Sequence, residues 1–324
     1  MNAPHAHDCP AADRLVDDAI RAIGAEIDAL TIPCLLGVVL GGGYARGEGG
    51  VFDAEGSAPR LSNDLDFYVV AEDGSSGAEL AAIAAALRPV SEKWTARLGV
   101  DVDFSPPKTP WRIRHDEERL MIQELVHGYC DVAGKPGAEL FKDIPRHPPE
   151  AFPFLEAVRL LVNRGVGLLL AAEPGASPDF VARNINKCIL GSWDAWLIAR
   201  GKYRWRALDR AAACGDDDRY HYRAAVQWKF RPKPEPVCDW ETAQAVWIDT
   251  CVEIDRLPWS RPYNWHRSLR DAARWLVRRR SLGPEPLRTL GLDPLIRIMN
   301  ALYPLVCDRK PLPASLRRDW EIFN

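Results

Sequence analysis

Four aspartates on two predicted strands have the spacing that best suits catalysis. Asp64 and Asp66 alternate with Leu65 and Phe67. Because successive side chains of a strand face opposite sides, both carboxylates share one face, about 7 Å apart. Hard oxygen ligands on a rigid strand suit Mg²⁺, which completes its octahedron with water and substrate phosphates. We therefore expect a magnesium ion between Asp64 and Asp66.

The second pair of acids, Asp101 and Asp103, alternates in the same way within the run from Gly99 to Phe104. A third carboxylate from this run would hold a second Mg²⁺ ion and accept the proton of the attacking hydroxyl. We take Asp103 as the third catalytic carboxylate. Since Asp101 shares its face, Asp101 is the alternative and is also a candidate metal ligand.

Three glycines, Gly41 to Gly43, follow a short apolar run that ends at Leu40. Backbone N–H groups approach a triphosphate closely only where no Cβ intervenes, and a helix that begins there adds its positive end. Arg46, a few residues later, would neutralise phosphate charge in the transition state. This segment is therefore the predicted phosphate-binding turn.

This order of strand, glycine turn, Asp-x-Asp strand and later acidic strand resembles the DNA polymerase β-like nucleotidyltransferase superfamily. The resemblance covers about Leu35 to Phe104. It implies that Gly42 and Gly43 bind the phosphates of a nucleoside triphosphate, expected to be ATP. It also implies that three carboxylates hold two Mg²⁺ ions and that a nucleotide is transferred to an acceptor hydroxyl with release of pyrophosphate. Those carboxylates are Asp64, Asp66 and Asp103 or Asp101.

Further segments resemble small bacterial members of the same superfamily. The run from Tyr44 to Glu48 resembles the residues after the turn, and Gln123 to Gly128 resembles the stretch after the third strand. The run from Arg183 to Lys187 resembles part of the helical bundle that follows the catalytic domain. The resemblance of the first run adds Tyr44, beside Arg46, as a nucleotide-binding candidate. Lys187 is a further candidate, because a helix that faces the cleft would offer its ammonium group to the phosphates; a position on a solvated helix face is the equal alternative. Glu48 is expected to be an ion-pair partner in the loop.

Asp-Leu-Asp alone occurs by chance in many strands, so the conjunction with the glycine run and the second acidic strand carries the functional hypothesis. The spacer between Gly43 and Asp64 has 20 residues. An extra loop around Val51 to Leu61 must therefore bring the turn and the carboxylates together. The alternative is a catalytically inactive relative that keeps the fold and binds nucleotide or a partner protein.

The elements that position these residues form an α+β fold with a small mixed-sheet domain, 1–150, followed by an all-helical domain, 151–324. Strands are predicted at Leu35 to Leu40, Leu65 to Val70 and Gly99 to Phe104, with the helices of this domain on one face of the sheet. Helical periodicity predicts helices at Ala11 to Leu30, Ala78 to Leu87, Phe154 to Ala172, Phe180 to Arg200, Trp240 to Arg256 and Trp265 to Arg280. Ten of the twelve tryptophans follow Pro153, and we interpret them as inter-helix packing.

The composition limits the partners. Lys plus Arg number 42 and Asp plus Glu 45, so a small-molecule or protein acceptor is favoured over long nucleic acid. The eight cysteines stand singly, which indicates reduced thiols. With no signal peptide and no apolar run of spanning length, we expect a cytoplasmic protein that does not contact membranes. The sequence selects neither an acceptor, a preferred base nor an oligomeric state.

Overall fold

The computed structural model describes residues 4–52, 59–214, 221–255 and 294–323. The chain forms two compact units, each described here by itself. The first unit contains Met1–Pro148 together with Trp205–Ala207 and Lys229–Lys233. The second contains Pro149–Arg204, Leu208–Trp228 and Pro234–Asn324. Two short segments that the sequence assigns to the helical half thus belong to the first unit.

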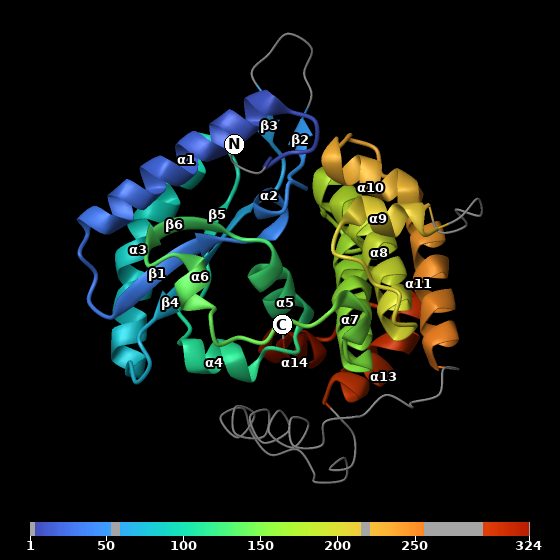
Figure 1. Ribbon diagram of the computed structural model, residues 1–324. Coiled ribbons are helices and arrows are strands. Elements are labelled where there is room, and N and C mark those ends of the chain that lie inside the picture. The colour runs from blue at the N-terminus through green and yellow to red at the C-terminus, as the bar shows by residue number, and fades with distance from the viewer. Residues whose placement is uncertain (1–3, 53–58, 215–220, 256–293, 324) are drawn as a thin grey trace. The chain divides into compact units, whose positions relative to one another are not determined.

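The first unit contains a four-stranded mixed sheet with the strand order β5-β4-β1-β6 (Figure 1). The central strands β1, Leu35–Leu40, and β4, Leu65–Ala71, are antiparallel, and β5, Val102–Phe104, runs parallel to β4. The outer strand β6, Cys130–Gly134, is antiparallel to β1. The α+β fold class and the strands predicted at Leu35 to Leu40 and Leu65 to Val70 are confirmed. Of the strand predicted at Gly99 to Phe104 only Val102–Phe104 is extended, because Gly99 ends the preceding helix in the left-handed conformation. Strand β6 was not predicted.

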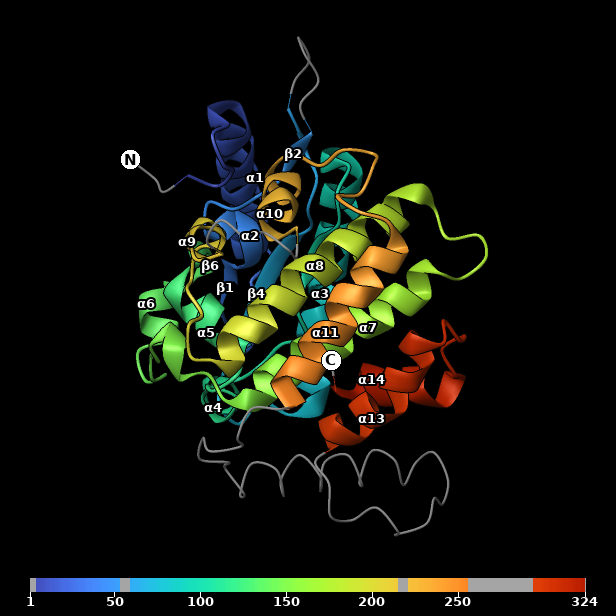
Figure 2. The ribbon, with the colours of Figure 1, turned by 90° about the vertical axis from the view of Figure 1, so that its right-hand side faces the viewer.

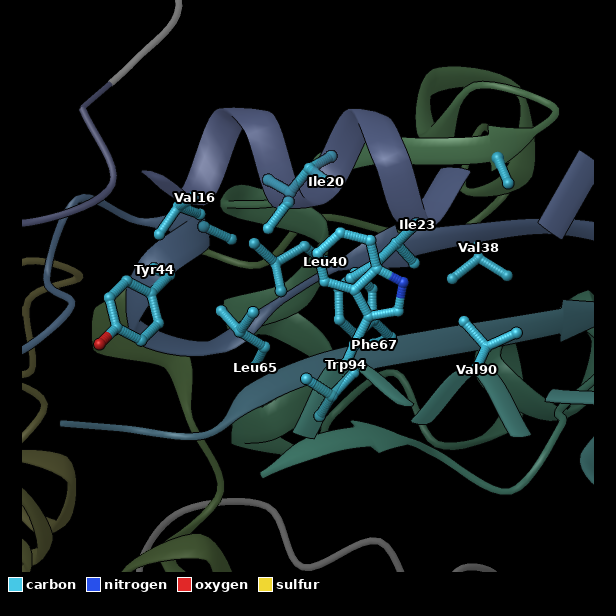
Figure 3. Packing of buried hydrophobic residues seen from close by; sticks show 14 of the residues in the cluster. Val16, Ile20, Ile23, Val38, Leu40, Tyr44, Leu65, Phe67, Val90 and Trp94 are labelled. Atoms are coloured by element: carbon cyan, nitrogen blue, oxygen red, sulfur yellow. The ribbon is translucent and has the colours of Figure 1, made fainter. Parts of the chain in front are cut away.

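Helices cover both faces of this sheet, so the expectation of helices on one face was wrong. Side chains of β1 and β4 alternate between two apolar clusters: Val38 and Phe67 enter the first, and Val39 and Val70 enter the second. The first cluster packs against α1, Pro10–Ala29, and α3, Gly77–Leu98 (Figure 3). The second packs against short helices of residues 110–144. Those helices are too short for helical periodicity to reveal them.

Helix α3 begins with a capping box formed by Ser76 and Glu79. The sequence predicts that this helix ends before Pro89, but it continues to Leu98. Buried Val90 and Trp94 extend its apolar face beyond the proline, and this packing compensates for the backbone hydrogen bond that proline cannot donate.

The second unit is helical. Helix α7, Phe154–Ala171, contacts α8, Pro178–Ala199, and α8 contacts α11, Trp240–Asp255 (Figure 2). The indoles of Trp240 and Trp247 on α11 donate hydrogen bonds of 2.9 and 2.8 Å to the carbonyls of Leu168 and Leu161 on α7. The packing interpretation is therefore confirmed for these two tryptophans. The predicted helix at 265–280 lies outside the described residues.

Shorter elements account for the other helices and strands of the described residues. In the first unit these are α2, Gly42–Ala45; β2, Val51–Phe52; β3, Arg60–Leu61; α4, Pro110–His115; α5, Leu120–His127; and α6, Gly137–Leu140. The later elements are η1, Pro149–Ala151; α9, Ala207–Ala212; α10, Tyr222–Phe230; α13, Pro294–Cys307; and α14, Ala314–Phe323. The eight cysteines are free thiols. In the part of the chain that the structure describes, we find no helix with the length and apolar character needed to cross a membrane.

Candidate active site

The pairing of β4 with β5 brings two of the predicted carboxylates together. In the parallel register Asp66 lies opposite Asp103, between the pairs Leu65–Val102 and Phe67–Phe104. Both aspartates are exposed, while the rings of Phe67 and Phe104 stack on the opposite face with centroids 5.1 Å apart. Neighbouring strands lie about 4.8 Å apart. The Asp66 and Asp103 side chains therefore leave the same face of the sheet as neighbours.

The other two predicted aspartates lie at the start of the same strands. The carbonyl of Asp101 accepts a hydrogen bond of 2.8 Å from the Leu65 amide, next to Asp64. Partial burial raises the pKa of Asp103, and the negative charges of Asp101 and Asp64 raise it further. A carboxyl whose pKa is raised by its neighbours lies in a region of negative potential. The cluster thus has the electrostatic character of a cation-binding site, and Asp101 and Asp103 both belong to it.

The glycine turn lies directly against this cluster. Gly42 has a φ of +68°, and a Cβ atom at this position would lie 2.5 Å from Oδ2 of Asp66. The Gly41 amide also donates a hydrogen bond of 2.8 Å to the Asp66 carbonyl. Only glycine combines this backbone conformation with so close an approach. The structure therefore brings the predicted phosphate-binding turn and the predicted metal ligand together.

The remaining residues of the turn have distinct positions. Gly43 lies in the single-turn helix α2, and its carbonyl accepts hydrogen bonds from the amides of Arg46 and Glu48 at 3.1 and 2.8 Å. Arg46 follows this turn, with Nη1 3.6 Å from Oε2 of Glu124 on α5. Lys187 lies exposed on α8 of the second unit. Its proposed contact with phosphates stays a prediction.

Tyr44 has a different position from the one that the resemblance implies. Its side chain is 1% exposed, and its hydroxyl donates to the Gly50 carbonyl at 2.6 Å. The same oxygen accepts hydrogen bonds from the amides of Ser62 and Asn63 at 3.1 and 3.4 Å. Burial, together with the nearby charge of Asp64, raises the pKa of Tyr44 to about 12. The Tyr44 phenol is therefore buried among the loop contacts and presents no exposed surface to a nucleotide.

These contacts explain how the long spacer is accommodated. Strands β2 and β3 pair with each other through Val51 and Leu61, and the Tyr44 hydroxyl closes the loop where both of its ends meet. The loop thus returns the chain to Asp64 beside the turn that it left. This confirms the extra loop that the spacing of the two motifs predicts.

Glu48 is a buried ion-pair partner, as the sequence indicates, but its partners were not predicted. Its side chain is 6% exposed. Oε2 accepts from Nζ of Lys229 at 2.6 Å, and Oε1 accepts from the Ala207 amide at 2.6 Å. Glu48 and Lys229 are 181 residues apart in the chain, so no local pattern could reveal the pair.

His5 is a second residue that sequence reasoning missed. It is 3% exposed, with Nδ1 2.9 Å from the Tyr44 carbonyl and Nε2 3.0 Å from Oδ1 of Asp17. Both partners are acceptors, so the ring satisfies them only as an imidazolium that donates from both nitrogens. Burial alone would lower the pKa of His5, but hydrogen bonds to Cys130, the Tyr44 carbonyl and Asp17 outweigh it and raise the pKa to about 9.

This imidazolium predicts a pH dependence of stability. The pKa of His5 is higher in the folded protein than in the unfolded chain, so its stabilising contribution is complete below about pH 6.5 and is lost as the pH rises toward 9. The loss amounts to about 3 kcal/mol. Urea unfolding of the wild type and of His5→Gln at pH 6 and at pH 9.5 measures it. The difference in unfolding free energy between the two proteins should shrink at the higher pH, and an equal difference at both would refute the assignment.

The donor set fits Mg²⁺ in its chemistry. Carboxylate oxygens on adjacent strands are the hard ligands that this ion takes, and it keeps water or phosphate oxygens in its other positions. Among the described residues, no three His, Cys, Asp or Glu side chains are grouped closely enough to hold a metal ion as they stand. Any ion held here therefore depends on oxygen atoms from its other ligands or on rotation of the aspartates.

Comparison of the chain with protein-family models and with curated proteins found no match.

Proposed function

We propose that this protein is a Mg²⁺-dependent nucleotidyltransferase that transfers a nucleoside monophosphate from ATP to an acceptor hydroxyl and releases pyrophosphate. One observation carries the proposal. The Gly42 backbone lies against the Asp66 carboxylate, and Asp66 lies beside Asp103 in the sheet. A phosphate held by the glycine turn would therefore lie next to the acidic cluster.

In this proposal the four aspartates bind the metal ions, and one of them also accepts a proton. Asp64 and Asp66, together with Asp103 and with Asp101 as a further ligand, would hold the Mg²⁺ ions. When bound, two Mg²⁺ ions would activate the attacking hydroxyl and neutralise the charge of the leaving pyrophosphate. Asp103, whose pKa is raised by partial burial and by the charges of Asp101 and Asp64, would accept the proton of the acceptor hydroxyl.

The backbone of Gly42 and Gly43 binds the phosphate oxygens, and Arg46 neutralises their charge. Tyr44 holds the turn in place through the loop contacts described above. The helical unit selects the acceptor, which is a small molecule or a protein, and the reaction takes place in the cytoplasm.

Transfer itself tests the proposal. The protein is incubated with Mg²⁺, a cell extract and each nucleoside triphosphate, labelled once in its α-phosphate and once in its γ-phosphate. We expect label from the α-phosphate in an acceptor and label from the γ-phosphate in pyrophosphate. Label from the γ-phosphate in the acceptor would identify a kinase instead. If the protein binds a nucleotide but transfers none of them, the catalytically inactive relative is favoured.

Arg46 distinguishes an enzyme from an inert nucleotide-binding protein. Arg46→Lys keeps the charge but loses the planar fork that pairs with two phosphate oxygens. If charge develops on the departing pyrophosphate, Arg46→Lys should lower turnover. The loss of transition-state stabilisation should be about 2 to 4 kcal/mol, and the loss of nucleotide affinity should be smaller. Single-turnover transfer and calorimetry on the wild type, Arg46→Lys and Arg46→Ala measure the two effects. Unchanged rates in both variants would remove Arg46 from the site.

A further inference from the structure

We infer that the helical unit contains an oxyanion-binding site at Arg164, and that the acceptor of the proposed reaction carries a phosphate or carboxylate group that binds there. Arg164 lies on α7 and is half-buried. The binding site itself is independent of the proposed function, whereas its assignment to the acceptor rests on that function.

Arg164 lies where α7 packs against α8 (Figure 2). A Cβ atom on Gly191 of α8 would lie 2.6 Å from Cγ, 2.7 Å from Nε and 2.9 Å from Cδ of Arg164. Because glycine has no Cβ, the arginine side chain occupies this space, and any other residue at position 191 would displace it. The contact with α8 thus gives the guanidinium group a defined place.

Within the described part of the chain, no hydrogen bond and no ion pair engages the Arg164 guanidinium. Its Nε atom is buried and has no hydrogen-bond partner. Burial lowers the pKa of Arg164, because its charge lies in poorly solvated surroundings. A charge in such surroundings is costly unless it is paired. The site therefore suits an anion that comes from outside the chain.

Two acidic groups on α8, Cys188 and Asp194, act electrostatically on Arg164. Burial raises the pKa of the Cys188 thiol to about 12, so this group is uncharged at neutral pH. Oδ1 of Asp194 already accepts from Nε of Arg210 and from the Tyr222 hydroxyl, both at 2.8 Å. The thiol supplies no charge and the carboxylate is engaged by Arg210, so neither group replaces an anionic ligand of Arg164.

The chemistry of the guanidinium group selects an oxyanion. Its parallel N–H donors match two oxygen atoms of a carboxylate or a phosphate. Part of the Arg164 side chain is exposed, so such a group reaches it from solvent. Charge-assisted hydrogen bonds are stronger in poorly solvated surroundings than at an open surface. A neutral or cationic molecule would gain nothing from this site.

Inorganic phosphate and succinate, titrated separately by calorimetry in EDTA without nucleotide, test the site. Arg46→Ala serves as the parent protein, which weakens any binding at the glycine turn. We expect phosphate, succinate or both to bind, and to bind at least tenfold more weakly when Arg164→Lys is added, because lysine keeps the charge but loses the fork. Arg318→Lys is the matched control, since Arg318 is an exposed arginine on α14 of the same unit. Equal affinity in the parent and in Arg164→Lys would overturn the inference, as would binding of neither anion.

Thermal unfolding gives a second readout of the same site. Without a bound anion the Arg164 charge is unpaired, so Arg164→Met should raise the melting temperature in EDTA by about 2 °C. The anion that binds should stabilise the parent protein but not Arg164→Met. If the anion stabilised both proteins equally, Arg164 would serve packing alone and the inference would be wrong, whatever the melting temperature of the variant.

Acceptor activity in the cell extract tests the assignment to the acceptor. The extract is passed over an anion-exchange resin before the transfer assay, and we expect acceptor activity in the retained fraction. Treatment of that fraction with alkaline phosphatase should abolish the activity of a phosphate ester and spare that of a carboxylate. Acceptor activity in the unretained fraction would refute the assignment. If no transfer occurs with any fraction, the proposed function fails, while the anion titrations still decide whether Arg164 forms a binding site.

Discussion

Asp66→Asn should abolish nucleotidyl transfer while leaving the metal-free protein as stable as the wild type or more stable. Asp66 lies opposite Asp103 in the sheet and against the glycine turn, so its carboxylate is the one best placed to hold an ion that also binds phosphate. Loss of a metal ligand there should lower the rate at least a thousandfold, or about 4 kcal/mol. In the absence of metal the carboxylates repel one another, so removing one charge relieves that repulsion.

Two measurements check both halves of this prediction. Transfer is followed with labelled nucleotide, and the melting temperature is recorded in EDTA and again with Mg²⁺. The added ion should raise the melting temperature of the wild type but not that of Asp66→Asn. Glu72→Gln is the matched control, since Glu72 is an exposed acid just beyond the opposite end of β4. Near-wild-type turnover in Asp66→Asn would show that the metal assignment is wrong.

Lys229→Met should lower the free energy of unfolding by about 3 kcal/mol. The variant leaves the Glu48 carboxylate, 6% exposed, without the ammonium group that lies 2.6 Å away. An uncompensated buried charge costs more than the intact pair contributes. The double variant Lys229→Met with Glu48→Gln should recover much of the loss, because it removes the buried negative charge and keeps the side-chain oxygen that accepts from the Ala207 amide.

Urea unfolding at pH 7 measures these effects. Lys233→Met serves as the control, since Lys233 is an exposed lysine in the same short segment. If Lys229→Met and Lys233→Met have equal stabilities, the Glu48 pair contributes little to the fold.

The central strands could be predicted because glycine or proline bounds apolar runs that are too short for helices. The edge strand β6 could not, since Cys130 to Gly134 has neither a continuous apolar run nor regular alternation. The predicted end of α3 before Pro89 was wrong, because the packing of Val90 and Trp94 outweighs the hydrogen bond that proline cannot donate. Local patterns therefore predict elements that have their own apolar run or periodicity, but they do not predict elements that depend on tertiary contacts.

In the candidate site, too, features with a local sequence pattern could be predicted, and features that depend on tertiary contacts could not. The spacing of Asp64 and Asp66 follows from the period of a strand, but the register that pairs Asp66 with Asp103 is a property of two separate strands. The sequence also gave no reason to single out His5, whose partners are a helix residue and a backbone carbonyl. The burial of Tyr44 was not predicted either, because a tyrosine is compatible both with nucleotide contact and with a buried hydrogen bond.

The contacts of Glu48 also have a consequence for how the protein is made. A ribosome synthesises the chain from its N-terminus, so the glycine turn and all four aspartates emerge long before Ala207 and Lys229. Until then the Glu48 carboxylate lacks both of the donors that hold it in the finished protein. A nascent chain that ends before Ala207 therefore carries every predicted catalytic carboxylate but lacks these two contacts of Glu48. Both contacts are present only after Lys229 has been synthesised, whereas the Tyr44 contacts that close the loop need no residue beyond Asn63.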